Sequence, residues 1–492
     1  MERYLLGIDV GTTGTKTLLF SESGKLLGHA YRQYELRAPR PGLSEQDAGD
    51  WWTALTLTVR EACAGIDPAG VAAIALSTQG GTLVPVNRRL EPLRPAIVWN
   101  DHRCAGERAL FEREYSAEYM YGTTGWELAD YLPALNLRWL RENEPETFKA
   151  AAMFLTVPDY LAARLTGRAA VDISNAGINQ LADIRRARYD GSLTAFSGVD
   201  ESRLPEIVRS GEAIGRLTVE AAEALGLTTK TLLVAGAHDQ YAVALGAGAV
   251  NNGDILIGSG TCWVVTAISD APDFESGLAQ SVSAVPGKWG SLLSLQEGGV
   301  CLEWLRKNVL DEEKLSFGAL DSVVSTRRAA ADGLFFHQGS GWYDRGRALR
   351  RGGFSGLTLA HDRFDMARAI MEGVVFQAAW MMEAFRARPS DAGLILAGGA
   401  SKSGPWRQIT ADILGLPVRV PRVAELACVG AAILAGVGGG VYNGVHEGLE
   451  RLSVGEETIL PDAASAAEYA GCFSEYKRRA RLFGEMYEGV DG

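Results

Sequence analysis

The chain lacks any apolar run long enough to span a membrane. Of its 492 residues, 47% are hydrophobic and 22% are charged, which is typical of a soluble globular protein. The first residues, Met1 to Leu6, run straight into a predicted strand and leave no room for a signal peptide. We therefore expect a cytoplasmic protein that has no membrane partner.

Cysteine is scarce, and basic residues are outnumbered by acidic ones. The six cysteines form no CxxC pair or other spacing typical of a metal site, so we expect reduced structural thiols. The formal net charge of -12 argues against a nucleic-acid partner, although it does not exclude a small anion bound at a locally positive site. The length favours two domains, and the sequence leaves open whether the chain forms a homodimer.

The stretch from Leu232 to Trp263 places an acidic residue at a strand end, ahead of a glycine-rich turn. An apolar run, Leu232–Ala235, predicts a buried strand, and Asp239 follows shortly after it. A second strand, Asp254–Gly258, leads into the turn Gly258–Thr261. A carboxylate can accept a proton from a hydroxyl group, and the N–H groups of a turn can hold a phosphate. The pattern therefore suggests phosphoryl transfer to an alcohol.

The beginning of the chain has a similar pattern. The predicted strand Leu5–Val10 carries Asp9 near its end, the turn Gly11–Gly14 follows, and Thr15–Phe20 returns. Lys16 follows the turn, but its spacing is not that of a Walker loop.

Other segments complete the secondary-structure prediction. We expect further strands at Lys25–Ala30, Val71–Leu76, Ala96–Trp99, Trp263–Ile268, Gly290–Leu295 and Gly393–Ala397. Helices are expected at Trp51–Cys63, Ala242–Val250 and Phe364–Ala384, and one that begins near Pro405. Residues 104–225 are predicted to be mainly helical, with an interruption at 122–130, a small-residue connection at 171–177 and a loop at 189–198.

The two halves of the chain repeat this layout with weak identity. The repeat predicts an α/β protein with two similar domains, at residues 1–246 and 247–492. A cleft between such domains would gather the loops at the strand ends, where ligands of these sheets usually bind.

Each candidate residue also has a structural interpretation. A glycine turn between strands is more often only a hairpin, and Asp239 at a strand end could simply cap the following helix. Asp9 could bind Mg²⁺ or accept hydrogen bonds within its own hairpin. A packed ring is the more common role for His238, as core packing is for Trp99, Trp126 and Tyr131, although these aromatic side chains could stack on a sugar.

Together, the motifs resemble the FGGY carbohydrate kinases, among which the xylulokinases look most similar. The matching segments cover nearly the whole chain: GIDVGTTGTK at 7–16, LSEQDAGDWW at 43–52, AIVWNDHR at 96–103, the signature from Gly352 to Glu372, and LAGGASKSGPWRQITADILGLPV at 396–418. The segment 132–140 matches less well, because Asn136 stands where the family usually has Lys. The resemblance implies two actin-like, hexokinase-like (ribonuclease H-like) domains and ATP-dependent phosphorylation of a sugar.

The resemblance also implies roles for individual residues. Asp239 would be the base that deprotonates the sugar hydroxyl, and Asp9 would hold Mg²⁺ together with Asp239. ATP would be bound by Gly11, Thr12, Thr13, Lys16, Gly260, Thr261, Gly399 and Ala400. The sugar would contact Thr78, Gln79, Asp101, Trp126, Tyr131, Asp239 and Gln240.

The identity of the substrate stays open at this point. Xylulokinases usually have Met-His where this chain has Thr78-Gln79, and Asp-Asn where it has Asp239-Gln240. The Arg-Glu pair of glycerol kinases is replaced by Gly80-Gly81, which counts against glycerol. A ketopentose such as xylulose is the first hypothesis, followed by another sugar, a polyol or a sugar acid. An actin-like or Hsp70-like nucleotide switch is the alternative from a different class, and a sugar-binding regulator without catalysis is a third.

Overall fold

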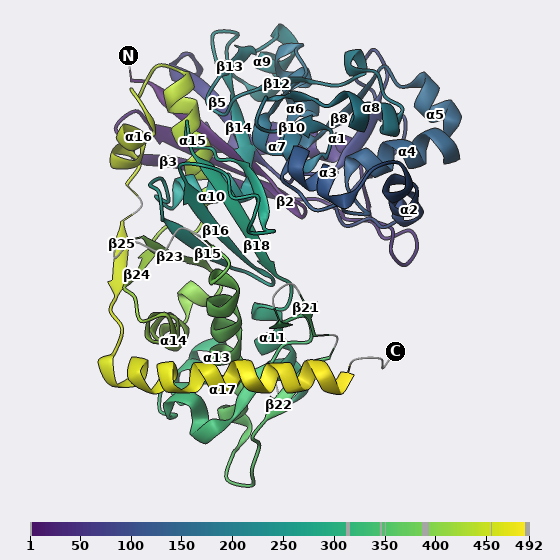
Figure 1. The fold of residues 1–492 in the computed structure, drawn as a ribbon. Coiled ribbons are helices and arrows are strands. Elements are labelled where there is room, and N and C mark those ends of the chain that lie inside the picture. Colours follow the sequence, from purple (N-terminus) through teal and green to yellow (C-terminus); the bar gives the residue numbers. More distant parts are fainter. Residues whose placement is uncertain are drawn as a thin grey trace. The chain divides into compact units, whose positions relative to one another are not determined.

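The computed structural model describes residues 2–310, 315–344, 347–349, 351–385, 393–453 and 455–487. Contacts divide the chain into two compact units (Figure 1). The first unit holds Met1–Val250, Asp270–Gly290 and Glu425–Ser453, and the second holds Asn251–Ser269, Ser291–Ala424 and Val454–Gly492. Within the described residues, every helix is either too short or too polar to cross a membrane.

The first unit is built on a six-stranded sheet. Its strands, in spatial order, are β13 (Ala213–Arg216), β14 (Leu232–His238), β5 (Val71–Thr78), β1 (Tyr4–Val10), β2 (Gly14–Ser21) and β3 (Leu26–Gln33). The strands β1, β5 and β14 run parallel, whereas β2, β3 and β13 each pair antiparallel with a neighbour.

Smaller elements complete the first unit. A four-stranded sheet holds β4 (Glu45–Gln46), β7 (Ala96–Ile97), β6 (Leu83–Val86) and β8 (Met153–Thr156). The remaining strands are β9 (Ala170–Asp172), β10 (Ala182–Asp183), β11 (Arg188–Tyr189), β12 (Glu206–Val208) and β17 (Ala279–Val282). The helices are α1 (Ala48–Ala62), α2 (Ala105–Glu114), α3 (Ala117–Thr124), α4 (Pro133–Asn143), α5 (Pro145–Ala150), α6 (Val157–Thr166), α7 (Ile173–Ile178), α8 (Gly191–Ser197), α9 (Val219–Leu225), α10 (Asp239–Gly246), α15 (Leu426–Gly438) and α16 (Val445–Arg451).

In the second unit, six strands of a seven-stranded sheet repeat the strand order of the first sheet. Its strands follow one another as β18 (Trp289–Leu295), β16 (Trp263–Ser269), β15 (Ile255–Ser259), β23 (Leu394–Gly398), β24 (Val418–Pro421) and β25 (Glu456–Ile459). Short pairs are β19 (Phe335–His337) with β22 (Gly353–Ser355), and β20 (Trp342–Asp344) with β21 (Arg347–Ala348). The helices are α11 (Gly299–Asn308), α12 (Phe317–Val324), α13 (Arg363–Met382), α14 (Gly404–Leu414) and α17 (Ala463–Tyr487).

The two sheets confirm the predicted repeat. In each, the first strand in the sequence forms an antiparallel hairpin with the next, β1 with β2 and β15 with β16. On its other side, the first strand pairs in parallel with a strand that comes later in the chain, β5 or β23. An antiparallel strand, β13 or β25, closes the far edge.

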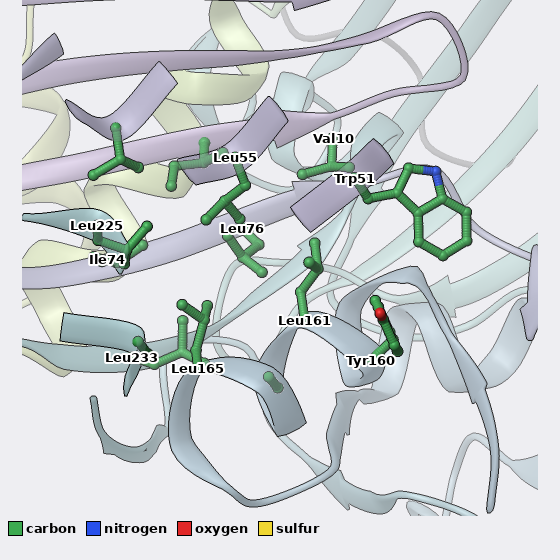
Figure 2. Close-up of a cluster of buried hydrophobic side chains, with 14 of the residues drawn as sticks. Val10, Trp51, Leu55, Ile74, Leu76, Tyr160, Leu161, Leu165, Leu225 and Leu233 are labelled. Atoms are coloured by element: carbon green, nitrogen blue, oxygen red, sulfur yellow. The ribbon is translucent and has the colours of Figure 1, made fainter. Parts of the chain in front are cut away.

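One face of the first sheet packs on α1, α6 and α9 through a large apolar cluster (Figure 2). Alternate residues of β1 point into this cluster, as expected for a strand that is covered on both faces. The indole of Trp51 is fully buried and meets the ring of Tyr160 edge-on, with the ring centroids 6.0 Å apart.

The opposite face of the first sheet packs on α10 and α15. A Cβ at Gly7 of β1 would lie 1.8 Å from the carbonyl oxygen of Cys428, so only glycine allows α15 this close. The two helices also approach backbone to backbone, because Cβ atoms at Gly246 and Gly430 would each lie 2.0 Å from a carbonyl oxygen of the other helix. The helix α15 is therefore part of the core of the first unit.

Several local predictions were wrong. Residues 189–198, predicted to be a loop, contain α8, which begins at the capping side chain of Asp190 and ends at the left-handed Gly198 (φ 73°). The predicted connection at 171–177 holds β9 and most of α7, with Asp172 as the helix cap. Residues 104–225 also contain six short strands, β8 to β13, between their helices. The strand predicted to run from Ala96 to Trp99 is only the two-residue β7.

Candidate active site

Three parallel strands of the first unit end side by side. Across β1, β5 and β14, the residues Val10, Thr78 and His238 are in register. Because parallel strands present their carboxyl ends at one edge of a sheet, three segments meet there. They are the turn Gly11–Gly14, the segment Gln79–Gly81 and the start of α10 at Asp239.

Two carboxylates lie at this edge. The side chain of Asp9 accepts a hydrogen bond of 2.8 Å from the Ser77 hydroxyl, which comes from β5 and not from its own hairpin. Burial raises the pKa of Asp9 to about 6, and the negative charge of Asp239 adds to the rise, while the Ser77 hydrogen bond and the charge of Lys16 oppose it. Asp9 and Asp239 are therefore close enough for their charges to interact.

The carboxylate of Asp239 is reachable from solvent, since its side chain is 31% exposed. Its Oδ1 lies 3.3 Å from Nε2 of His238, whose side chain is only 7% exposed. The imidazole in turn fills the space beside Gly80, where a Cβ would lie 2.7 Å from His238 Cδ2. A buried ring thus stands directly against the candidate base.

The strand end that carries His238 is itself fixed by hydrogen bonds. The backbone N–H of His238 donates to the hydroxyl of Ser174 (2.9 Å), and that hydroxyl donates to the carboxylate of Asp172. Burial raises the pKa of Asp172, against the hydrogen bonds from Asn175 and Ser174. The cap of α7 therefore holds the backbone that precedes Asp239.

Some buried polar atoms around this edge have no hydrogen-bond partner within the described residues. They are Thr78 Oγ1, Trp126 Nε1 and His238 Nδ1. The ring centroids of Trp126 and His238 are 6.2 Å apart. Because buried polar groups are nearly always satisfied, these three atoms are candidate contacts for a polar ligand or for water.

The cation that follows the first turn is already paired. Lys16, which is in register with Asp9 across the hairpin, forms an ion pair of 2.7 Å with Glu425. Burial alone would lower the pKa of Lys16, but the hydrogen bond and charge of Glu425 outweigh it and raise the pKa.

The second unit has a corresponding turn after β15. Gly260 and Thr261 are exposed there, and the preceding Ser259 accepts hydrogen bonds from the N–H groups of Gly399 (2.6 Å) and Ala400 (3.1 Å). Within this unit, the structure thus brings together two segments that are about 140 residues apart in the sequence.

Two residues beside this turn were missed by the sequence analysis. The N–H groups of Gly298 and Gly299, at the start of α11, donate to the carbonyl oxygens of Thr261 and Gly260, both at 3.1 Å. A Cβ at Gly298 would lie 2.2 Å from the ring of Trp263. The adjacent glycines ahead of an amphipathic segment were the signal that could have located them.

Comparison with known proteins places this geometry in a family. The models of the N-terminal and C-terminal domains of the FGGY family of carbohydrate kinases match residues 4–246 and 254–439. The chain belongs to the FGGY family of carbohydrate kinases. It is therefore an ATP:sugar phosphotransferase, and the alternatives of a nucleotide switch and a non-catalytic regulator fall away.

Similar proteins cover nearly the whole chain. The xylulose kinase of Escherichia coli is 29% identical over 98% of both chains. The L-xylulose/3-keto-L-gulonate kinase of the same organism is 29% identical over 97% of this chain and 96% of its own. The crystal structure of the xylulose kinase from Rhodospirillum rubrum has a TM-score of 0.90 at 27% identity, covering 99% of this chain and 100% of that one.

Two of the side chains expected to contact the sugar already use their polar atoms in hydrogen bonds within the protein. Asp101 is fully buried, and its carboxylate accepts hydrogen bonds from the Arg103 guanidinium (2.8 Å) and the Ser44 N–H (2.6 Å). Burial would raise the pKa of Asp101, but these hydrogen bonds lower it. The amide of Gln79 is likewise bonded within the protein, to Thr12 and Gln46.

The other expected sugar contacts are less enclosed. Trp126 and Tyr131 are partly buried and pack against a small apolar cluster made of Ala129, Leu132 and Ile178. Gln240 is partly buried at the second position of α10.

The chemistry of the acidic pair fits Mg²⁺. That ion is usually held by one or two carboxylates together with water and substrate phosphates. The described residues contain no group of three or more His, Cys, Asp or Glu side chains arranged as a metal site. Asp9 and Asp239, two interacting carboxylates of which one is buried, are the kind of pair that such an ion needs.

Proposed function

We propose that this FGGY kinase phosphorylates a ketopentose, with D-xylulose as the first candidate. The proposal is supported by relatives that are named xylulose kinase and cover nearly the whole chain. The observation that carries the chemistry is the pair Asp9 and Asp239 beside the first glycine turn, with the carboxylate of Asp239 open to solvent.

Asp239 is the general base in this proposal. Its carboxylate accepts the proton of the sugar hydroxyl as the hydroxyl oxygen forms a bond to the γ-phosphorus of ATP. The bond between that phosphorus and the β,γ-bridging oxygen breaks, ADP leaves, and the protonated Asp239 returns its proton to solvent. His238, 3.3 Å from the carboxylate, keeps the base in one orientation.

Asp9 and Asp239 would hold Mg²⁺. When bound, the ion offsets the charge of the β- and γ-phosphates. The buried Asp9 carboxylate, whose pKa is raised to about 6, supports this role, because a nearby cation would stabilise its charged form.

Nucleotide binding is assigned to backbone turns. In the first unit the residues are Gly11, Thr12, Thr13 and Lys16, and in the second they are Gly260, Thr261, Gly399 and Ala400. Turns that present N–H groups can bind phosphate through the backbone, and Lys16 of β2, which is paired with Glu425, would add its positive charge beside the first turn.

Direct sugar contact is assigned to Thr78, Asp101, Trp126, Tyr131 and Gln240, together with Asp239. Gln79, also expected among the sugar contacts, has its amide bonded to Thr12 and Gln46. The unpartnered buried atoms of Thr78, Trp126 and His238 support a ligand with several hydroxyl groups. Asp101 would contribute through the loop that it fixes, because its carboxylate oxygens already accept several hydrogen bonds.

The charges favour a neutral sugar over a sugar acid. The guanidinium of Arg103, the arginine of the 96–103 segment, bonds to Asp101 (2.8 Å) and to Glu45 (2.8 Å). It therefore has little capacity left for a substrate carboxylate. A kinase for a keto-sugar acid is the second candidate, because the L-xylulose/3-keto-L-gulonate kinase is as similar as the xylulose kinase of the same organism.

The test is an ADP-release assay over ketopentoses, polyols and aldonic acids, with the wild type and Asp239→Asn. We expect D-xylulose to give the highest kcat/KM. The Asn variant, which cannot accept the proton, should lose transfer by about a hundredfold or more while ATP binding stays near normal. Near-full transfer by Asp239→Asn would remove Asp239 from the base role, and preference for an aldonic acid would refute the neutral sugar.

A further inference from the structure

The carbonyl oxygens of the first glycine turn are all bonded to protein donors. The Gly11 oxygen accepts from the Tyr34 hydroxyl (2.5 Å), the Thr12 oxygen from the Gln46 amide, and the Thr13 oxygen from the Tyr34 N–H (3.3 Å). A carbonyl oxygen facing a phosphate would repel it, so a turn that binds phosphate must point its acceptors elsewhere. The carbonyl oxygens of Gly11, Thr12 and Thr13 are thus held by protein donors.

Two buried glutamines close a ring of hydrogen bonds on Thr12. The Thr12 hydroxyl donates to Gln79 Oε1 (3.1 Å), Gln79 Nε2 donates to Gln46 Oε1 (2.9 Å), and Gln46 Nε2 donates to the Thr12 carbonyl. Gln46 and Gln79, called the glutamine pair below, are 1% and 2% exposed. The indole N–H of Trp51 also donates to Gln46 Oε1 (3.2 Å), which fixes which way that amide points.

The backbones of both glutamines are also bonded. Gln46 lies in β4, where it pairs with Ala96 of β7, and the N–H of Gln79 bonds to the carbonyl of Val10 (3.0 Å) just before the turn. Each glutamine is therefore anchored by its backbone as well as by its amide.

The ring also reaches an exposed aromatic side chain. The indole N–H of Trp99, which is 42% exposed, donates to the Thr12 hydroxyl (3.0 Å). One hydroxyl therefore joins the turn to both Gln79 and Trp99.

We propose that the glutamine pair positions the first turn for the nucleotide phosphates, so that Gln79 acts on ATP through Thr12 and does not act as a direct sugar ligand. This inference rests on the proposed role of the turn in binding phosphate. Both polar atoms of the Gln79 amide are engaged, which leaves the side chain one remaining lone pair and one N–H for any other partner.

The test is binding of a non-hydrolysable ATP analogue with Mg²⁺ to the full-length protein without sugar, measured by calorimetry. Gln79→Met keeps the length and burial of the side chain but removes both hydrogen bonds. We expect its Kd to rise about five- to tenfold, the effect of one or two neutral hydrogen bonds. Gln46→Met should raise the Kd by a similar factor. In the double variant the Kd should rise by less than the product of the two single factors, because both substitutions break the same ring.

The matched control is Thr58→Val, which removes another buried hydrogen bond of the first unit, the 2.8 Å bond to Thr17. It should lower the melting temperature and leave the analogue's Kd unchanged. Wild-type affinity in Gln79→Met would overturn the proposal. A raised KM for D-xylulose with unchanged nucleotide affinity would overturn it in favour of a direct sugar contact.

Binding by the wild type separates a failure of the proposed function from a failure of the glutamine pair's role. If the wild type itself does not bind the analogue, the proposed function of the turn is wrong and the role of the glutamine pair falls with it. If the wild type binds and both Met variants bind equally well, only the glutamine pair loses its role.

Discussion

The absence of a side chain at Gly80 leaves room for the imidazole of His238 beside the candidate base, Asp239. The space that its Cβ would fill belongs to the imidazole of His238, and that imidazole lies against Asp239. A methyl group at position 80 would also lie 2.9 Å from Ile178 Cγ2. The orientation of the carboxylate therefore depends on a residue that contributes no functional group.

Replacing Gly80 by Ala should slow transfer without weakening ATP binding. The new methyl group displaces the His238 ring and with it the Asp239 carboxylate, so we expect kcat to fall roughly ten- to a hundredfold. The control is Gly106→Ala, a position in α2 where a Cβ meets nothing within 4 Å. Equal kcat in the two variants, measured by ADP release, would show that the ring does not orient the base.

The residues of the site were predictable to different degrees. Asp9, Asp239 and the glycine turns follow from sequence, because strand ends and glycine clusters are local patterns. The hydrogen bond between Gln79 and Gln46 and the ion pair between Lys16 and Glu425 could not be predicted from sequence, because these partners lie 33 and 409 residues apart in the chain. Sequence therefore located the candidate groups, whereas the structure showed which of them are already engaged.

At the scale of elements, the local differences come from short helices and short strands. The helix α6 begins after Thr156 with a reciprocal cap by Asp159, and Pro158 stands in its first turn, where proline is common. The cap of α8 was missed, because its helix is only seven residues long and has no clear apolar period. Short capped helices are therefore the elements that an apolar pattern in the sequence predicts least well.

The cap of α6 should make stability depend on pH. Asp159 is fully buried, and burial raises its pKa from 3.8 to about 7, despite the hydrogen bonds from Thr156. The folded state therefore holds this proton more tightly than the unfolded state. Its contribution is complete below pH 3.8 and is lost as the pH rises to about 7, by up to about 1.4 kcal/mol per pH unit in the free energy of unfolding.

Urea unfolding of the wild type and Asp159→Asn at pH 5 and pH 8 measures this effect. The Asn variant does not titrate, so the wild type should lose more stability than the variant between the two pH values. A pH-independent difference between the two proteins would contradict the raised pKa.

At the scale of the molecule, the first unit is discontinuous in sequence. Its sheet is complete by residue 238, but α15, which packs on β1, β5 and β14, arrives only with residues 426–438. The predicted boundary at 246 divides the sequence once, whereas the first unit also holds Asp270–Gly290 and Glu425–Ser453. A repeat in the sequence indicates two similar sheets, but it cannot indicate which sheet a later helix covers.

Two truncated chains test this dependence. Residues 1–424 and 1–453 both lack β25 and α17, and they differ only in the segment that returns to the first unit. The shorter chain should lose cooperative unfolding of the first unit and become sensitive to limited proteolysis between residues 1 and 250, because one face of its sheet is uncovered. The longer chain should keep that unit protected, and equal sensitivity would show that α15 is dispensable.

The late position of α15 also bears on how the protein is made. When residue 250 leaves the ribosome, the sheet of the first unit still lacks one covering helix, and the chain must grow to residue 438 before that helix is complete. At roughly 5–20 residues per second, the wait lasts on the order of 10–40 s. During that interval an apolar sheet surface is open to chaperones, and codon choice in the second half of the gene would govern how long the first half stays unfinished.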